Sequence, residues 1–138
     1  MAPVCRPASK APHLCATPFC RNSHAKGRNV CSKCHTRWYR ETHPINYTYH
    51  YLRVRARRRG IEFLLTLDEF IKFCLATNYI ALKGRFKNDA SIDRIREGEP
   101  YQADNIQLLT VGNNVAKRRA WEAVQRKIQS SVAPENPF

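Results

Sequence analysis

The sequence predicts an α+β protein in which a small cysteine-rich unit precedes helices and a strand–strand–helix segment. Close cysteine pairs fall within residues 15–34, residues 46–59 space their apolar side chains as a helix does, and two short extended runs precede a last helical pattern. The 138 residues suffice for one domain or two very small ones. We expect a flexible basic arm over 1–14, a cysteine-anchored unit over 15–42, a helix- and strand-containing core over 43–128 and a tail over 129–138.

The charge balance is strongly basic, with 24 Lys and Arg against 11 Asp and Glu and a formal net charge of +13. An excess of this size repels itself in the folded state and marks a polyanionic partner, so we expect nucleic-acid binding. No run approaches the eighteen or so apolar residues of a membrane span, and no secretory signal pattern is present. Six cysteines without such a signal favour a reducing compartment, so we expect a cytoplasmic protein without a membrane partner.

Four cysteines form two close pairs with the spacing C-x4-C-x10-C-x2-C, and they are Cys15, Cys20, Cys31 and Cys34. Four thiolates at tetrahedral geometry suit Zn²⁺, and bound metal supplies folding energy that so short a segment cannot obtain from a core. The spacing therefore predicts a zinc-finger-like unit with a structural zinc and no catalytic role. Two alternatives stay open: free, partly buried thiols, or a site in which His24 or His35 replaces one cysteine.

Two helices are predicted between this unit and the strands. The first covers 46–59 and stops at Gly60, and Ile61–Leu65 follows as a short extended piece. The second starts with a capping box between Thr66 and Glu69 and ends near Asn78. Its apolar stripe includes Cys74, which we expect to act as a small buried hydrophobe.

The C-terminal half reads as strand, loop, strand and helix. We expect strands over 91–95 and 106–110, joined by a turn-rich connection, and a last helix over 113–128 that follows Gly112. Asn113 or Asn114 is a suitable N-cap for that helix.

Arginines crowd the first predicted helix, and further cations stand in the loops and the last helix. Arginine and lysine neutralise phosphates and release counterions, which gives affinity without sequence reading. The neighbouring tyrosines are expected to pack rather than to stack on bases. The residues predicted to contact nucleic acid are Arg53, Arg55, Arg57, Arg58, Arg59, Lys83, Arg85, Lys87, Lys117 and Arg118.

Part of this pattern resembles a known family. The segment Ser91–Lys117, with Ile92-Asp93-Arg94-Ile95, Tyr101, Asp104–Leu109 and Asn114, resembles the core of HNH (His-Me finger) endonucleases. This ββα-metal unit is often found in phage and mobile-element proteins, and the resemblance extends over about residues 45–120. It implies a ββα-metal core and metal-dependent hydrolysis of phosphodiester bonds in DNA, in the host cytoplasm if a phage encodes the chain.

The resemblance also implies roles for four residues. Asp93 and Asn114 would hold Mg²⁺ or another divalent cation, and Asn105 would hold the loop by hydrogen bonds. The family's general-base histidine falls on Arg94, whose guanidinium stays protonated and cannot accept a proton as imidazole does. Arg94 can instead clamp the scissile phosphate.

Three functions therefore stay open. The chain is a metal-dependent endonuclease, a non-catalytic zinc-containing DNA- or RNA-binding protein on the same scaffold, or a zinc-finger adaptor for an acidic protein. The structural observation that separates the first two is whether a histidine, His43 or His50 first of all, approaches Asp93 and Asn114.

Overall fold

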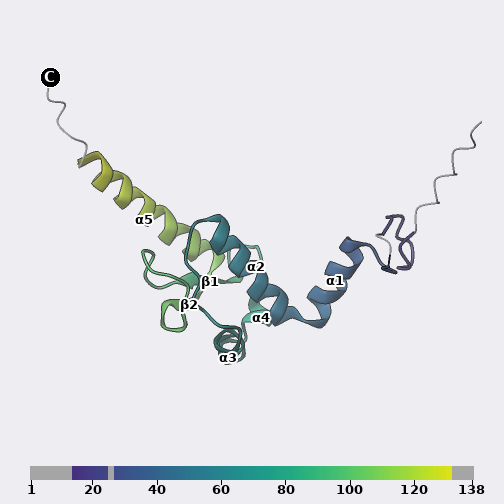
Figure 1. Cartoon of the computed structure of the whole chain (residues 1–138). Coiled ribbons are helices and arrows are strands. Elements are labelled where there is room, and N and C mark those ends of the chain that lie inside the picture. The colour runs from purple at the N-terminus through teal and green to yellow at the C-terminus, as the bar shows by residue number, and fades with distance from the viewer. Residues whose placement is uncertain (1–13, 25–26, 132–138) are drawn as a thin grey trace, which may run out of the picture. The chain divides into compact units, whose positions relative to one another are not determined.

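The computed structural model describes residues 14–24 and 27–131 and divides the chain into two compact units, Met1–Pro44 and Ile45–Phe138. The predicted arm, apart from Leu14, and the end of the predicted tail lie outside the described residues. The described residues form helices and a two-stranded antiparallel sheet (Figure 1). The cysteine cluster belongs to the N-terminal part of the chain. The α+β class is thus confirmed.

The first unit is built around a short loop and helix α1 (Ser32–Thr42), which begins directly after Cys31. Cys31 is the N-cap of the helix, because its sulfur accepts a hydrogen bond from the backbone N–H of Cys34. In the part of this unit that the structure describes, Cys15 and Cys31 are the buried residues. So small a buried set stabilises little by itself, which leaves folding energy for a bound metal to supply.

The second unit opens with three helices. Helix α2 (Pro44–Arg58) confirms the helix predicted over 46–59, and Gly60 follows it with a φ of 66°. Helix α3 (Leu67–Thr77) carries the predicted capping box and ends at Asn78, which adopts the left-handed conformation. The single turn α4 (Tyr79–Leu82) comes directly after it and was not predicted.

The core of the second unit lies where these helices meet the sheet. Phe70 is fully buried, Leu65 and Ala56 are 2 % exposed, and Cys74 is buried among them as predicted. Burial raises the pKa of the Cys74 thiol to about 11. The stretch predicted to be extended before α3 forms a single bridge, between Phe63 and Tyr101, instead of a strand.

The sheet pairs β1 (Ala90–Arg94) with β2 (Ile106–Thr110). The second strand has its predicted bounds. The first lies one residue earlier than predicted, since Ala90 pairs with Thr110 and Ile95 is already outside the ladder. The connection between the strands contains the short 3₁₀ helix η1 (Ala103–Asn105).

Helix α5 (Val111–Ser131) follows β2 without a loop, so the predicted start at residue 113 is wrong. The cap differs too: the hydroxyl of Thr110 accepts the backbone N–H of Asn113 at 3.2 Å. Gly112 lies inside the first turn, where a Cβ would come within 2.7 Å of Lys87 Cγ, so a larger residue would force Lys87 to shift. None of the described helices is long and apolar enough to cross a membrane.

Candidate metal centre and basic pocket

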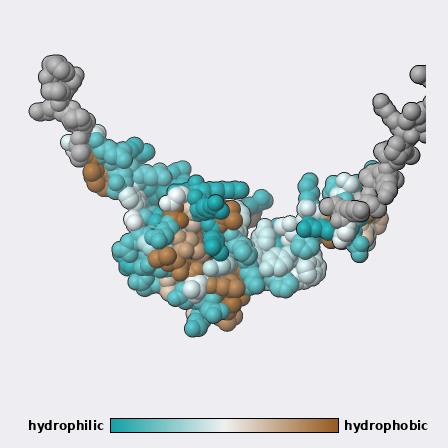
Figure 2. All heavy atoms as spheres, viewed as in Figure 1, coloured by the Kyte–Doolittle hydropathy of each residue, from teal (hydrophilic) through white to brown (hydrophobic). Residues whose placement is uncertain are grey.

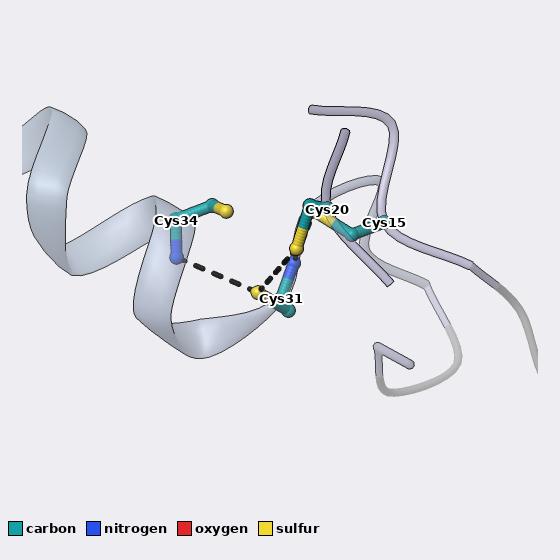
Figure 3. Close-up of side chains that lie close together, drawn as sticks. All are labelled: Cys15, Cys20, Cys31 and Cys34. Carbon is teal, nitrogen blue, oxygen red and sulfur yellow. Dashed lines mark hydrogen bonds between the residues drawn. The ribbon is translucent and has the colours of Figure 1, made fainter. Parts of the chain in front are cut away.

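The four predicted cysteine ligands come together in the first unit, with all four sulfurs within 4.8 Å of one another. Cys15 and Cys20 stand on the loop, and Cys31 and Cys34 at the start of α1 (Figure 3). The Cys20 and Cys31 sulfurs are 3.8 Å apart. Zinc–sulfur bonds of about 2.3 Å at tetrahedral angles place two sulfurs about 3.8 Å apart. The donor set therefore fits a tetrahedral metal ion such as zinc.

Several N–H groups point at these sulfurs. The backbone N–H of Cys31 donates to Cys15 Sγ at 3.2 Å, and that of Cys34 donates to Cys31 Sγ at 3.5 Å. The side chain of Asn22 donates to the sulfurs of Cys20 and Cys31 at 3.5 and 3.7 Å. Donors of this kind stabilise charged sulfur and hold each ligand in place.

The same contacts change the acidity of the thiols. A hydrogen bond with the Thr17 side chain, helped by the backbone N–H of Cys31, lowers the pKa of Cys15 to about 6. The pKa of Cys31 is lowered by the backbone N–H of Cys34. A lowered pKa increases the thiolate fraction of Cys15 and Cys31, which is the form that binds metal. At Cys34 the hydrogen bond with Thr17 lowers the pKa, but the hydrogen bonds with Cys20 and Cys31 outweigh it and raise the pKa to about 11.

The metal cluster is made of cysteines alone. Among the described residues, the groups close enough to share an ion are the four cysteines, with neither His24 nor His35 among them. The described cysteines also form no disulfide. Four sulfurs close the coordination sphere and leave no position for a substrate, which is typical of a structural site.

Asp93 lies at the other candidate site, in the second unit, and is 3 % exposed on β1. Its Oδ2 accepts a hydrogen bond from Lys117 Nζ at 2.6 Å and one from Gln107 Nε2 at 2.9 Å. The Lys117 ammonium also donates to the Arg94 carbonyl and lies 3.6 Å from Glu97 Oε1. Lys117, which was predicted to contact phosphate, thus forms its contacts with groups of the protein itself.

Asn114 reaches the same strand from the first turns of α5. Its side-chain nitrogen donates to Ser91 Oγ at 3.1 Å and to the Ile92 carbonyl at 3.3 Å. Asn114 and Asp93 both line one pocket of about 540 Å³. The structure therefore brings the two predicted cation ligands to one cavity. The carboxylate of Asp93 is at the same time paired with the ammonium of Lys117.

Asn105 is fully buried beneath the connection between the strands. Its Oδ1 accepts the backbone N–H of Arg96 at 2.8 Å, and its Nδ2 donates to the carbonyls of Pro100 and Arg96 at 2.8 and 3.2 Å. This one carboxamide satisfies three backbone groups and closes the turn after β1.

Arg94 is buried beside the same turn. Its guanidinium donates to the Glu99 carbonyl at 2.6 Å and to Glu97 Oε2 at 2.9 Å, and it lies over the Tyr101 ring. Two of its donor nitrogens are thus already engaged, which leaves fewer for a phosphate.

No histidine of the described part of the second unit lines the pocket of Asp93 and Asn114. His50 is exposed and belongs to a separate depression on the other side of α2. His43 belongs to the first unit, where its ring stacks on Tyr39 at 4.8 Å.

The pocket is lined by more basic than acidic side chains, and we call it the basic pocket. Its acidic members are Asp93 and Glu97, and its basic members are Arg55, Arg59, Lys83, Arg85, Arg94 and Arg118. Lys83 donates to Thr48 at 2.7 Å, and Arg118 lies 3.6 Å from Glu122.

The arginines of α2 and of the turn directly after it lie on two faces. Tyr47, Tyr51, Arg55 and Arg59, four residues apart, all line the basic pocket. Arg53 and Arg57 line the separate depression with His50, while Arg58 is exposed. The loop residue Lys87 is exposed and outside both.

Several contact residues were not predicted. Gln107 lies opposite Asp93 in the sheet. Pairing the two predicted strands in this register would have predicted their contact. Glu97 and Ser91 hold Lys117 and Asn114 across distances in the chain that no local pattern reveals. Asn22 and Thr17 had no signal except their position between cysteines.

Comparisons of the chain with models of protein families, with curated proteins and with solved structures found no match. The endonuclease resemblance therefore rests on the residues quoted for it, and the ββα-metal assignment stays a prediction. The described structure itself establishes an α+β fold with a cysteine cluster that can hold a metal ion.

Proposed function

We propose that the protein binds nucleic acid, DNA in the first place, through its phosphodiester backbone in the basic pocket, with the cysteine cluster holding a structural zinc. The observation that carries this is the pair Arg55 and Arg59. Both side chains line the pocket, and neither forms an ion pair with an acidic residue of the described ranges.

The distribution of charge supports a polyanion over an acidic protein surface. The ion pairs of the described residues lie within 93–122, so the acidic groups there neutralise their own neighbours and leave the α2 arginines uncompensated. Two arginines one helical turn apart match successive phosphates of a backbone, and the binding they give is independent of base sequence.

Hydrolysis is the second candidate, because Asp93 and Asn114 line the same pocket. These two residues would hold the divalent cation that the resemblance implies, and that ion would polarise a phosphodiester and acidify water. As they stand the residues do not fit this ion, since Lys117 and Gln107 occupy the Asp93 carboxylate. Binding without cutting is therefore the function that the geometry supports best.

A charge-matched pair of double variants tests the binding proposal. Arg55→Gln with Arg59→Gln removes two cations from the basic pocket, while Arg53→Gln with Arg57→Gln removes two with equal spacing from the other face of α2. Fluorescence anisotropy with a labelled DNA duplex, measured over a salt series, gives the affinity and its salt dependence.

The pocket variant is expected to bind about tenfold more weakly, and its plot of log K against log salt to flatten by about 1.8, since each phosphate contact contributes about 0.9 to the slope. The control variant should change both quantities much less. Equal losses in the two variants would show that charge, and not this pocket, determines binding.

A plasmid-nicking assay with Mg²⁺ or Mn²⁺ tests the second candidate. We expect no cutting above background by the wild-type chain at concentrations that saturate binding. Nicking that disappears in Asp93→Ala while binding persists would instead establish hydrolysis.

A further inference from the structure

Trp121 lies on α5, outside the hydrophobic core of the second unit. The helix has no buried residue, and Figure 1 shows its C-terminal half extending beyond the sheet. Figure 2 shows a mostly hydrophilic surface along this helix in that view. Trp121 is half-buried and outside the hydrophobic core cluster. A large aromatic side chain outside the core can offer a flat apolar face with a polar N–H to a ligand.

The tryptophan lines a depression of about 430 Å³, which we call the tryptophan depression. Arg59, Arg118 and Arg126 line it as well, together with the amide side chains of Gln125 and Gln129. Its acidic members are already paired: Glu122 lies 3.6 Å from Arg118, and Glu97 lies 2.9 Å from Arg94. The depression therefore combines an aromatic ring, uncompensated positive charge and hydrogen-bonding amides.

The tryptophan depression lies next to the basic pocket. Arg59, Arg94, Glu97 and Arg118 line both cavities. A backbone held by Arg55 and Arg59 would therefore have Trp121 beside it, since Arg59 lines both cavities. Aromatic side chains beside a cationic track are the arrangement by which proteins stack unpaired bases while binding the phosphates.

We propose that Trp121 is a stacking platform for an unpaired base, so that the preferred ligand is a strand with exposed bases and not a closed duplex. The inference rests on the proposed function and deepens it by naming the class of nucleic acid. Bases in a duplex are stacked on each other and have no free face for the indole ring, whereas every base of a single strand offers one. The guanidinium groups around Trp121 take the flanking phosphates.

The experiment uses the full chain and compares an oligothymidylate with a duplex of equal length. The chain has two tryptophans, so Trp38→Phe leaves Trp121 as the single emitting indole. Oligothymidylate is expected to quench that emission. Trp121→Ala should lower single-strand affinity about tenfold with little change in duplex affinity, and Trp121→Phe should retain most of it, because phenyl also stacks.

Val124→Ala is the matched control, since Val124 is an apolar residue of α5 that is 54 % exposed and does not line the depression. Thermal unfolding of each variant checks the fold. Unchanged emission, with equal single-strand affinity of Trp121→Ala and wild type, would overturn the inference while the pocket variants still test the proposed function. Absence of binding to either nucleic acid would overturn both.

Discussion

Individual polar residues hold the strand–turn–strand segment in shape, and Asn105 does so most directly. Its side chain provides the hydrogen-bond partner for a backbone N–H and two carbonyls of the turn. Local sequence pattern does not reveal this arrangement, because the partners lie five to nine residues away in the chain. The turn is therefore specified by one buried carboxamide.

Asn105→Ala is expected to lower the free energy of unfolding by about 3 kcal/mol, because it leaves buried backbone groups without partners. Urea unfolding at neutral pH, followed by circular dichroism, measures this change. Asn113→Ala is the control, since that side chain is exposed. A loss no larger than that of the control would show that the turn holds without the carboxamide.

Lys117 and Asp93 form an ion pair whose carboxylate is 4 % exposed and whose ammonium side chain is 28 % exposed. Removal of one partner leaves a buried charge uncompensated, which costs far more than loss of a surface pair. Lys117→Met is therefore expected to destabilise the protein by about 2 kcal/mol, a figure reduced for the partial exposure of the lysine.

The double variant Asp93→Asn with Lys117→Met should recover most of that loss, since no charge is then left alone. Chemical unfolding of the single and double variants completes the cycle. Lys127→Met, an exposed cation of the same helix, should leave stability unchanged. Additive losses in the double variant would indicate that the two residues do not interact.

Among the secondary-structure elements, α3 has the clearest local determinant. The Glu69 N–H donates to Thr66 Oγ1 at 3.3 Å, and the Thr66 N–H donates to Glu69 Oε2 at 2.9 Å. This reciprocal box satisfies two donors at the helix start. The same contacts lower the pKa of Glu69 below its ordinary value of 4.5, with the backbone N–H of Thr66 as the main cause.

Thr66→Ala is expected to cost about 1 kcal/mol of stability at neutral pH. A carboxyl whose pKa is lowered in the folded state stabilises the protein above its unfolded pKa and loses that contribution as the pH falls through the folded pKa. The difference between wild type and variant should therefore narrow below pH 4.5. Thermal unfolding over a pH series measures it.

The control is Asp68→Asn, which removes another carboxylate from the first turn without touching the box. A gap between wild type and Thr66→Ala that stays constant from neutral to acidic pH would show that the Thr66 hydroxyl contributes nothing through the charge of Glu69.

At the scale of the whole molecule, the two units have different sources of stability. The second unit has a core around Phe70 and Leu65, whereas the described part of the first has little buried beyond two cysteines. A bound metal ion would then supply folding free energy to the first unit and not to the second. The emission of Trp38, in α1, reports on that unit.

Removal of metal with a strong chelator is expected to unfold the first unit and leave the thermal transition of the second unchanged. A Trp121→Phe chain, in which Trp38 is the single tryptophan, measures the first effect by fluorescence, and elemental analysis measures the zinc released. Lower pH should weaken retention, because protons compete with the metal for thiolates.

Cys31→Ser is expected to prevent zinc retention, while Cys74→Ser, in the core of the second unit, should retain zinc. A first unit that keeps its Trp38 emission after complete metal removal would contradict a structural role for the ion.

Features that depend on neighbours in the chain were predictable. The cysteine spacing, the Thr66 cap, the helix α2 and the bounds of β2 each follow from a residue pattern that is visible along the chain. The start of α5 was not, because the cap depends on Thr110 at the end of a strand and on the close approach of Lys87 to Gly112. Both require the sheet to be in place first.

The order of residues alone specified the spacing of the cysteine cluster, the Thr66 cap of α3 and the excess of positive charge, since these are patterns of the sequence or of its composition. Tertiary packing determined which groups the charged side chains contact. It placed Lys117 on a carboxylate twenty-four residues away, divided the α2 arginines between two faces and left Trp121 beside a basic track. Such pairings depend on three-dimensional distance, because a hydrogen bond requires its heavy atoms within about 3 Å and Coulomb attraction weakens as the charges move apart. The spacing of residues along the chain does not give that distance.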